Sequence, residues 1–333
     1  MVLPPNDPLP SRLRVDSSDA GLRADAFLFL ELPFLSRTRL RQKIQMGESL
    51  LNGRRYATST RLNAGDEITV LWRSLPGPGP LPTLDVLFED PHLLAVNKPA
   101  GVASHPMGRR QHGTVVQWAR HRHADLIREG LKQGESGFYP TLANRLDVFT
   151  SGIVLIAKTR AAHAAIQGLM TRRLVTKEYI ALVEGTINEE GVIDLPINSD
   201  QRSKVRVKMT TRAGGQPSVT RYTIIRQLPG HTLVRAFPLT GRQHQIRVHF
   251  AAIGHPVWGD LLYKDERLFL RYQRNEGILD ETLPARQCLH ATRMSFAHPM
   301  TGAAITIEAP LPADFLAILA DIEARSATTS RSG

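Results

Sequence analysis

A short segment rich in proline and glycine divides the chain into two parts. The sequence SLPGPGPLP, residues 74–82, holds four prolines and two glycines in nine residues. Proline breaks helices and cannot donate a hydrogen bond to a neighbouring strand, so neither a helix nor a central strand accepts this segment. We interpret it as a linker, which means that the chain folds as two domains.

The domain boundaries follow from this linker. We predict a small domain over residues 12–73 and a larger one over residues 83–320, and both lengths are usual for domains. Residues 1–11 are rich in proline and residues 321–333 end in SATTSRSG. We expect both ends to be flexible tails.

The composition narrows the class of partner. The chain of 333 residues carries 42 Lys and Arg against 31 Asp and Glu, a formal net charge of +11. This excess predicts a polyanionic partner, with nucleic acid ahead of an anionic membrane. The single cysteine, Cys288, excludes an intramolecular disulfide, a cysteine-rich zinc site and an iron–sulfur cluster. Neither a membrane-spanning run nor a secretory signal is evident, so we expect a soluble, cytoplasmic protein.

The small domain has a strongly basic middle. Between residues 36 and 61 the only acid is Glu48, and the net charge of this stretch is +6. Ser36 is a good N-cap for a helix that ends at Gly47, and Asn52 followed by Gly53 indicates a tight turn. A solvated helix face is the alternative reading, but such faces usually mix signs. We predict that phosphates are bound by Arg37, Arg39, Arg41, Lys43 and Arg54.

The small domain also resembles a known module. The patterns L-R-x-D-x-F-L at residues 22–28 and S-R followed by Ile44 are similar to the S-four-type RNA-binding domain of a ribosomal protein, as are Asn52-Gly53 and Gly65-Asp66. The resemblance implies a small αL-type domain with an RNA-binding surface made by two helices and a hairpin.

The larger domain mixes strands and helices. SGIVLIAK, residues 151–158, is an apolar run that predicts a buried strand, and residues 218–228 and 232–239 predict an antiparallel pair. Alanine-rich residues 160–173 predict a helix, as do residues 242–254. We therefore expect an α+β fold around a large mixed or antiparallel sheet.

Residues 201–250 contain ten basic side chains and no acid. The alternation KVRVK predicts a strand with Lys204, Arg206 and Lys208 on one face. A solubilising surface is the alternative, but a long basic stretch is costly unless an anion neutralises it. We predict a groove for nucleic acid.

Most common catalytic schemes are absent from the sequence. The twelve histidines are scattered without carboxylates in register, and no phosphate-binding loop, dinucleotide loop or serine nucleophile motif occurs. What remains is a lone acid among cations, Asp147, which lies between Arg145 and the turn at residues 150–152. Such a carboxylate keeps its charge and could serve as a nucleophile, or it could pair with arginine to hold a turn.

The motif around Asp147 resembles the catalytic motif of RluA-type pseudouridine synthases. RLDVFTSG covers residues 145–152, and further motifs of that family follow in the right order. They are EDPHLLAVNKPAGVASHP (89–106), VTKEYIALVEG (175–185), PLTGRQHQIRVHFAAIGHPVWGD (238–260) and LHATRMSFAHPMTG (289–302).

This resemblance implies the pseudouridine synthase fold and an isomerase that converts uridine in structured RNA to pseudouridine. The base is detached at nitrogen 1, turned, and rejoined through carbon 5, without cofactor or metal. Asp147 would be the nucleophile or base, Tyr179 would stack on the flipped uracil, and Arg247 would pair with Asp147. RNA contacts are expected from Asn144, Arg145, Arg242, His244 and Gln245.

Several points stay open at this level. Most relatives have histidine where this chain has Asn144, and Phe149 could pack in the core or wedge into the space that the flipped base leaves. We expect large-subunit ribosomal RNA as substrate, with transfer RNA as the alternative, and a monomeric protein. The competing interpretation is an RNA-binding or ribosome-assembly protein whose catalytic site has decayed. A sugar hydrolase is disfavoured because a second acid is missing.

Overall fold

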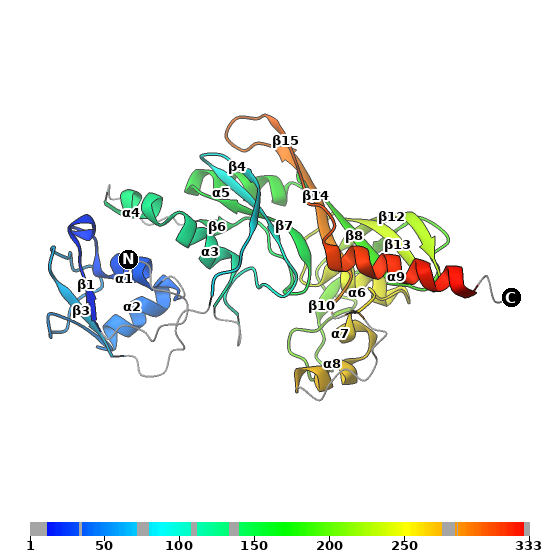
Figure 1. Cartoon of the computed structure of the whole chain (residues 1–333), viewed down its shortest axis with the longest axis horizontal. Helices are drawn as coiled ribbons and strands as arrows, with labels where there is room; N and C mark the ends of the chain where they lie inside the picture. Colours follow the sequence, from blue (N-terminus) through cyan, green and yellow to red (C-terminus); the bar gives the residue numbers. More distant parts are fainter. Residues whose placement is uncertain are drawn as a thin grey trace.

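The computed structural model describes residues 12–32, 35–71, 80–107, 112–132, 140–274, 284 and 286–329. Within these residues a small unit of strands and helices precedes a larger mixed unit, and the two lie along the long axis of the molecule (Figure 1). The expected α+β class with a large mixed sheet is confirmed. The tail predicted at residues 1–11 and most of the predicted linker lie outside the described residues.

The small unit is a three-stranded sheet covered by two helices. Its antiparallel strands follow the order β1 (Arg12–Arg14), β3 (Glu67–Val70) and β2 (Ser49–Leu51). The helices are α1 (Ala24–Glu31) and α2 (Arg37–Gln45).

Local signals in the small unit act as predicted. The Ser36 side chain caps α2 by accepting a hydrogen bond from the Arg39 amide at 3.3 Å. Gly47, Asn52 and Gly53 all have positive φ angles, of 74°, 48° and 78°. These angles end α2 and form the tight turn after β2. The core of this unit includes the fully buried Phe27 and Leu40, but its membership of the S-four class stays a prediction.

Ten strands form the sheet of the larger unit. Eight follow the order β4-β5-β7-β14-β8-β13-β12-β9, while β6 pairs with β7 and β15 pairs with β14. Only the β7–β14 pair is parallel among the described strands, so the sheet is mixed. The strands are β4 (Asp85–Glu89), β5 (Leu93–Lys98), β6 (Thr141–Leu142), β7 (Ser151–Ala157), β8 (Thr176–Glu184), β9 (Gly191–Asp194), β12 (Val219–Leu228), β13 (His231–Pro238), β14 (Leu289–Ala297) and β15 (Ala304–Glu308).

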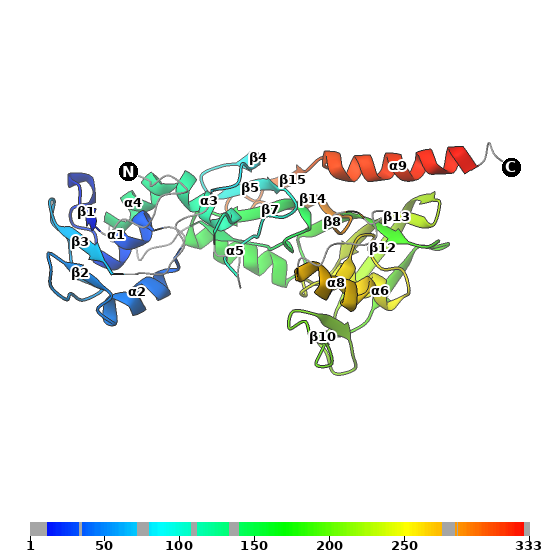
Figure 2. The same cartoon turned by 60° about the horizontal axis from the view of Figure 1, so that its bottom comes forward.

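Helices cover both faces of this sheet, which explains why β7 is apolar throughout. Leu155 on one face belongs to a cluster with Ile166 of α5, and Ile156 on the other belongs to a cluster with Val115 of α3. Figure 2 shows α6 and α9 on opposite sides of the other half of the sheet. The helices of this unit are α3 (Val115–Arg122), α4 (Ala124–Lys132), α5 (Arg160–Thr171), α6 (Gln245–Ala252), α7 (Leu261–Lys264), α8 (Glu266–Gln273) and α9 (Ala313–Thr329).

The two units touch through α3 and α4. The guanidinium of Arg128 binds the Asp19 carboxylate at 2.7 Å, and the Asp19 side chain is 6% exposed. Leu131 packs against the core of the small unit, and the Arg120 guanidinium lies 5.0 Å from the Phe29 ring centroid. A partly buried ion pair and an apolar contact therefore orient the small unit on the larger one.

Three predicted elements are corrected by the structure. KVRVK forms no strand: residues 200–208 are a loop between β10 (Ile197–Ser199) and β11 (Met209–Thr211). The side chain of Glu266 accepts hydrogen bonds from the Lys204 amide and the Lys208 ammonium. The loop backbone is thus bonded to a side chain rather than to a neighbouring strand, and its cations do not share a strand face.

The other two corrections concern helix ends. α6 begins at Gln245 and not at Arg242, because the Gln245 side chain accepts from the Arg242 amide at 3.0 Å and holds the preceding turn. α9 continues to Thr329, past the predicted start of the tail at residue 321. Ile322 is 8% exposed and packs against the sheet, which keeps this part of the helix in place.

At Gly152 the two central strands leave no room for a side chain. This glycine has a φ of +112°, and a Cβ atom there would lie 2.2 Å from the Ala291 carbonyl oxygen. We predict that Gly152→Ala lowers the free energy of unfolding by about 3 kcal/mol or more, since both crowding and backbone strain oppose it. Gly168→Ala in α5 meets no atom within 4 Å and should stabilise the protein by about 0.5–1 kcal/mol. Chemical denaturation of both variants measures the difference, and similar values would contradict the prediction.

Candidate active site

Asp147 lies on a tightly held loop that enters β7. The Thr150 amide donates to the Asp147 carbonyl at 3.1 Å and closes the turn, while the Thr150 hydroxyl accepts from Gln287 at 2.7 Å. Ser104 bonds both the amide and the carbonyl of Leu146, at 3.1 and 2.9 Å. Hydrogen bonds on both sides of Asp147 therefore limit how far its backbone can move.

A buried lysine also holds this loop through hydrogen bonds to backbone carbonyls. The Lys98 ammonium, with 0% of the residue exposed, donates to the carbonyl oxygens of Pro99, Val102 and Val148 at 3.0, 2.9 and 3.1 Å. A buried cation is stabilised by such dipoles. Its charge also lies close enough to Asp147 to favour the ionised carboxylate.

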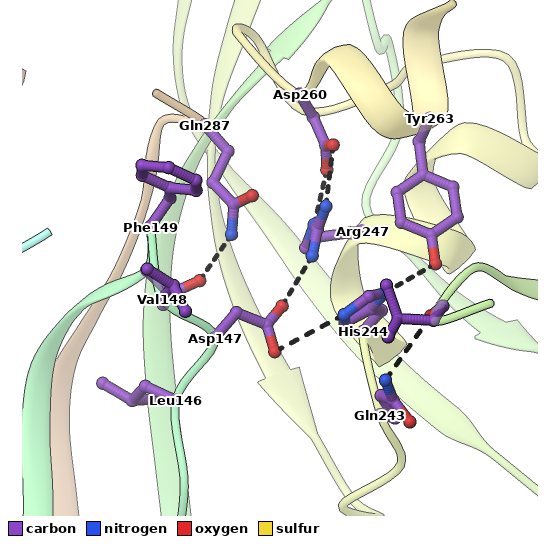
Figure 3. A network of polar contacts seen from close by, with 12 residues as sticks. Leu146, Asp147, Val148, Phe149, Gln243, His244, Arg247, Asp260, Tyr263 and Gln287 are labelled. Atoms are coloured by element: carbon purple, nitrogen blue, oxygen red, sulfur yellow. Dashed lines mark hydrogen bonds and ion pairs between the residues drawn. The ribbon is translucent and has the colours of Figure 1, made fainter. Parts of the chain in front are cut away.

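Arg247 connects two carboxylates (Figure 3). Its Nη1 donates to Oδ2 of Asp147 at 2.8 Å, while Nε and Nη2 bind the Asp260 carboxylate at 2.6 and 2.9 Å. The side chains of Arg247 and Asp260 are 7% and 1% exposed, whereas that of Asp147 is 28% exposed. The predicted pairing of Arg247 with Asp147 is present, and Asp260 fixes the guanidinium from the buried side.

The charges around Asp147 keep it ionised. Burial acts to raise the pKa of Asp147, but the electrostatic influence of His244 and Arg247 outweighs burial and places the pKa below its ordinary value. Burial lowers the pKa of His244 to about 4, so His244 is neutral at pH 7. The cation that acts on Asp147 at that pH is therefore chiefly Arg247, whose pKa is raised because the two carboxylates outweigh its burial.

Tyr179 and His244 complete the surroundings of Asp147. Tyr179, in β8, packs between two apolar clusters, and burial together with the Asp147 charge raises its pKa, so it stays a phenol. His244 precedes α6 with a φ of +55°, and its Nε2 lies 3.9 Å from Oδ1 of Asp147. Its Nδ1 lies 2.9 Å from the hydroxyl of Tyr263. The site thus combines one carboxylate with a phenol and a neutral imidazole.

Two residues predicted to contact RNA form hydrogen bonds within the protein, and their contact with RNA stays a prediction. The Asn144 amide donates to the Ile153 carbonyl at 3.2 Å and accepts from the Leu155 amide at 2.7 Å. Gln245 is 4% exposed, and its amide bonds β12 and the turn before α6. Both side chains have the hydrogen-bonding capacity that the predictions required, but the local backbone uses it.

Other predicted RNA contacts remain available in the structure. Arg145 is exposed. Burial of His105 lowers the pKa of that histidine, and the positive charge of Arg145 lowers it further. Arg242 is exposed outside the helix, with its Nε donating to the Pro217 carbonyl at 3.3 Å. Phe149 is half-buried, which fits neither a core residue nor a fully exposed wedge.

The basic face of the small unit is partly neutralised. Asp25, whose side chain is 0% exposed, pairs with Arg23, Arg37 and Arg41 at 3.1, 3.1 and 2.6 Å. Lys43 pairs with Glu48. The sequence window from residue 36 to 61 did not include Asp25, so it overstated the free charge of this face. Arg39 and Arg54 are exposed and carry no ion pair to a carboxylate among the described residues.

The described residues contain no candidate metal centre and no candidate membrane span. No cluster of three or more histidine, cysteine or acidic side chains there could hold a metal ion. None of the helices in that part of the chain is both long enough and apolar enough to cross a bilayer.

Comparisons with known proteins point to one family. A family model described as RNA pseudouridylate synthase matches residues 92–252. The ribosomal large subunit pseudouridine synthase D of Xanthomonas campestris is 33% identical over 339 residues, which cover 98% of each chain. The uncharacterised RNA pseudouridine synthase YlyB of Bacillus subtilis is 32% identical, over 90% of this chain and 94% of that protein.

Solved structures show the same relationship. Human RNA pseudouridylate synthase domain containing 1 aligns with a TM-score of 0.53 and 27% identity, over 71% of this chain and 86% of that one. Human RNA pseudouridylate synthase domain containing 4 has a TM-score of 0.52 at 23% identity, over 71% of this chain and 92% of that one, and shares the fold. The chain belongs to the RNA pseudouridine synthase family. This confirms the resemblance drawn from its motifs.

Sequence reasoning missed three residues of the site. Asp260 and Tyr263 follow α6 in the chain, and Lys98 is part of the first family motif, but no pattern linked them to Asp147. The available signal was the acid in the GHPVWGD end of the long motif, thirteen residues after Arg247. Only the fold shows that this acid returns to the arginine.

The Arg247–Asp260 pair offers a stability test with a matched control. We predict that Asp260→Asn lowers the free energy of unfolding by about 3–5 kcal/mol, because a buried guanidinium loses its main counter-charge. Arg293 pairs with Glu308, but both side chains are exposed, by 50% and 61%. Glu308→Gln should cost about 1 kcal/mol or less. Equal losses in urea denaturation would show that burial does not set the strength of these pairs.

Proposed function

We propose that this RNA pseudouridine synthase uses Asp147 as its catalytic carboxylate. The observation that carries the proposal is the Arg247 clamp: it leaves Asp147 ionised, aimed and 28% exposed, so that a substrate can reach it. A decayed site would have no reason to keep a buried arginine between two carboxylates.

The isomerisation requires few further groups from the protein. The uridine base leaves carbon 1 of the ribose, turns, and rejoins through carbon 5, which then loses its proton. Asp147 acts either as the nucleophile in this sequence or as the base, and Tyr179 forms the floor against which the flipped uracil stacks. Tyr179 is suited to this place because its ring is held between apolar clusters beside Asp147. No redox change occurs, and we propose no cofactor.

The direct test replaces the carboxylate. Asp147→Asn keeps size and hydrogen bonding but removes the charge, so we expect no detectable isomerisation and nearly unchanged RNA affinity. Asp125→Asn, on an aspartate whose side chain is 100% exposed on α4, should be fully active. Single-turnover tritium release from labelled uridine measures the rate, and filter binding measures affinity. Conversion by Asp147→Asn at the normal rate would overturn the proposal.

For the substrate we propose large-subunit ribosomal RNA. The support is the named function of relatives such as the Xanthomonas campestris and Nitrosomonas europaea enzymes, each 33% identical to this chain. Mapping pseudouridines in total RNA from a strain without the gene tests this. Loss of a site in ribosomal RNA supports the proposal, whereas loss confined to transfer RNA would replace it with the alternative substrate.

We propose that the small unit adds phosphate contacts through Arg39 and Arg54, together with Arg145 and Arg242 on the larger unit. Each phosphate contact adds about 0.7–0.9 to the slope of log affinity against log salt. Replacing Arg39 and Arg54 by glutamine should therefore reduce the slope by about 1.5. As a control, Arg12 and Arg293 each pair with an exposed glutamate, and their double replacement should leave the slope nearly unchanged. Equal effects of the two double variants would indicate a general charge effect.

A further inference from the structure

A chain of three hydrogen-bonding groups ends beside Asp147. The Met209 amide, at the start of β11, donates to the Tyr263 hydroxyl at 3.0 Å. That hydroxyl lies 2.9 Å from Nδ1 of His244, and Nε2 on the far side of the same ring lies 3.9 Å from Oδ1 of Asp147 (Figure 3). The three groups come from β11, α7 and the turn before α6.

The number of protons in this chain determines the form of the histidine. A backbone amide can only donate, so the Met209 amide occupies a lone pair of the Tyr263 oxygen. Burial raises the pKa of Tyr263, and its phenol keeps one proton to donate. The acceptor within reach is Nδ1 of His244. If Nδ1 carried a proton instead, the phenol proton would have no acceptor among the described residues.

The imidazole proton therefore resides on Nε2, because the ring is neutral at pH 7. This N–H group faces the carboxylate but is too far from it for a hydrogen bond, at 3.9 Å. Among the described residues it has no other hydrogen-bond partner, although the His244 side chain is only 9% exposed. The backbone of His244 also adopts the left-handed conformation, with a φ of +55°. Strain of this kind is retained where the surroundings hold a side chain in a particular place.

We propose that the Nε2–H group of His244 donates a hydrogen bond to the O2 oxygen of the target uracil, and that Tyr263 is the positioning residue that fixes this tautomer. The inference rests on the proposed role of Asp147. O2 is bonded to the ring carbon next to N1, at the end of the base whose bond to the ribose breaks. When that bond breaks, negative charge develops on N1 and O2, and a fixed donor there stabilises it.

The kinetic test separates the two ring nitrogens. Glutamine places its amide nitrogen near the position of Nε2, whereas asparagine places it near Nδ1. His244→Asn should lower the saturated single-turnover rate about 100-fold, and His244→Gln less than about 10-fold. Exposed His121→Asn serves as the control and should match the wild type. A glutamine variant no more active than the asparagine variant would overturn the assignment of the donor to Nε2.

The spectroscopic test does not depend on activity. Long-range proton–nitrogen correlation spectra of the full-length protein, labelled with nitrogen-15 in histidine, distinguish a ring protonated at Nε2 from one protonated at Nδ1. The His244 signal, identified by its absence in His244→Gln, should report Nε2–H in the wild type. In Tyr263→Phe it should show mixed tautomers, and the rate should fall at saturating RNA while RNA affinity holds. A pure Nδ1–H form in the wild type, or an unchanged tautomer and rate in Tyr263→Phe, would overturn the proposal.

These outcomes are distinguishable from failure of the proposed function. If Asp147→Asn remains active, the catalytic role of the carboxylate fails, but the tautomer spectrum still tests the hydrogen-bond chain. If Asp147→Asn is inactive and both His244 variants have the wild-type rate, the role of Asp147 stands and the donor to uracil is refuted.

Discussion

The site depends on a single guanidinium placed between two carboxylates of unequal exposure. Arg247 binds Asp260 through two nitrogens on the buried side and Asp147 through one on the open side. The ion pair with Asp260 offsets most of the desolvation cost of Arg247, so Arg247 does not depend on Asp147 to remain buried. Asp147 can therefore approach a substrate while a fixed positive charge keeps it ionised. In a simple Arg–Asp pair, the same carboxylate would have to neutralise the buried arginine and approach the substrate. Any movement of Asp147 would then leave a buried cation without its partner.

The fold explains how distant segments meet at this point. β7 and β14 pair in parallel at the centre of the sheet, and Gly152 permits the contact because its neighbour Ala291 leaves no room for a Cβ atom. The loop that carries Asp147 enters β7 from this end, and it is held by hydrogen bonds from Lys98 to the Val148 carbonyl and from Gln287 to the Thr150 hydroxyl. Rigid elements therefore surround the carboxylate, which is the condition for holding a reacting group at a fixed place.

Much of this could be predicted from the sequence, but by two different routes. Local patterns predict the buried strand β7, the N-cap at Ser36 and the antiparallel pair β12–β13. These features could be predicted because hydrophobic periodicity and helix capping depend on only a few neighbouring residues. The pairing of Asp147 with Arg247 came only from ordered family motifs, since the two residues lie a hundred positions apart. Asn144 and Gln245 lie beside or inside these motifs, but no sequence pattern indicated that their side chains bond the protein backbone.

The failure of the charge count has a physical reason. A sequence window counts cations along the chain, whereas neutralisation occurs in space. Asp25 lies outside the basic window but binds two of its arginines, and Glu266 lies outside the acid-free stretch but binds Lys208. The protein thus uses a few acids to hold part of its positive charge in place. The phosphate-binding surface that we propose is therefore smaller than the composition indicates, because it is confined to the cations left unpaired. A small surface of this kind would allow a strongly basic protein to favour one RNA geometry over general attraction.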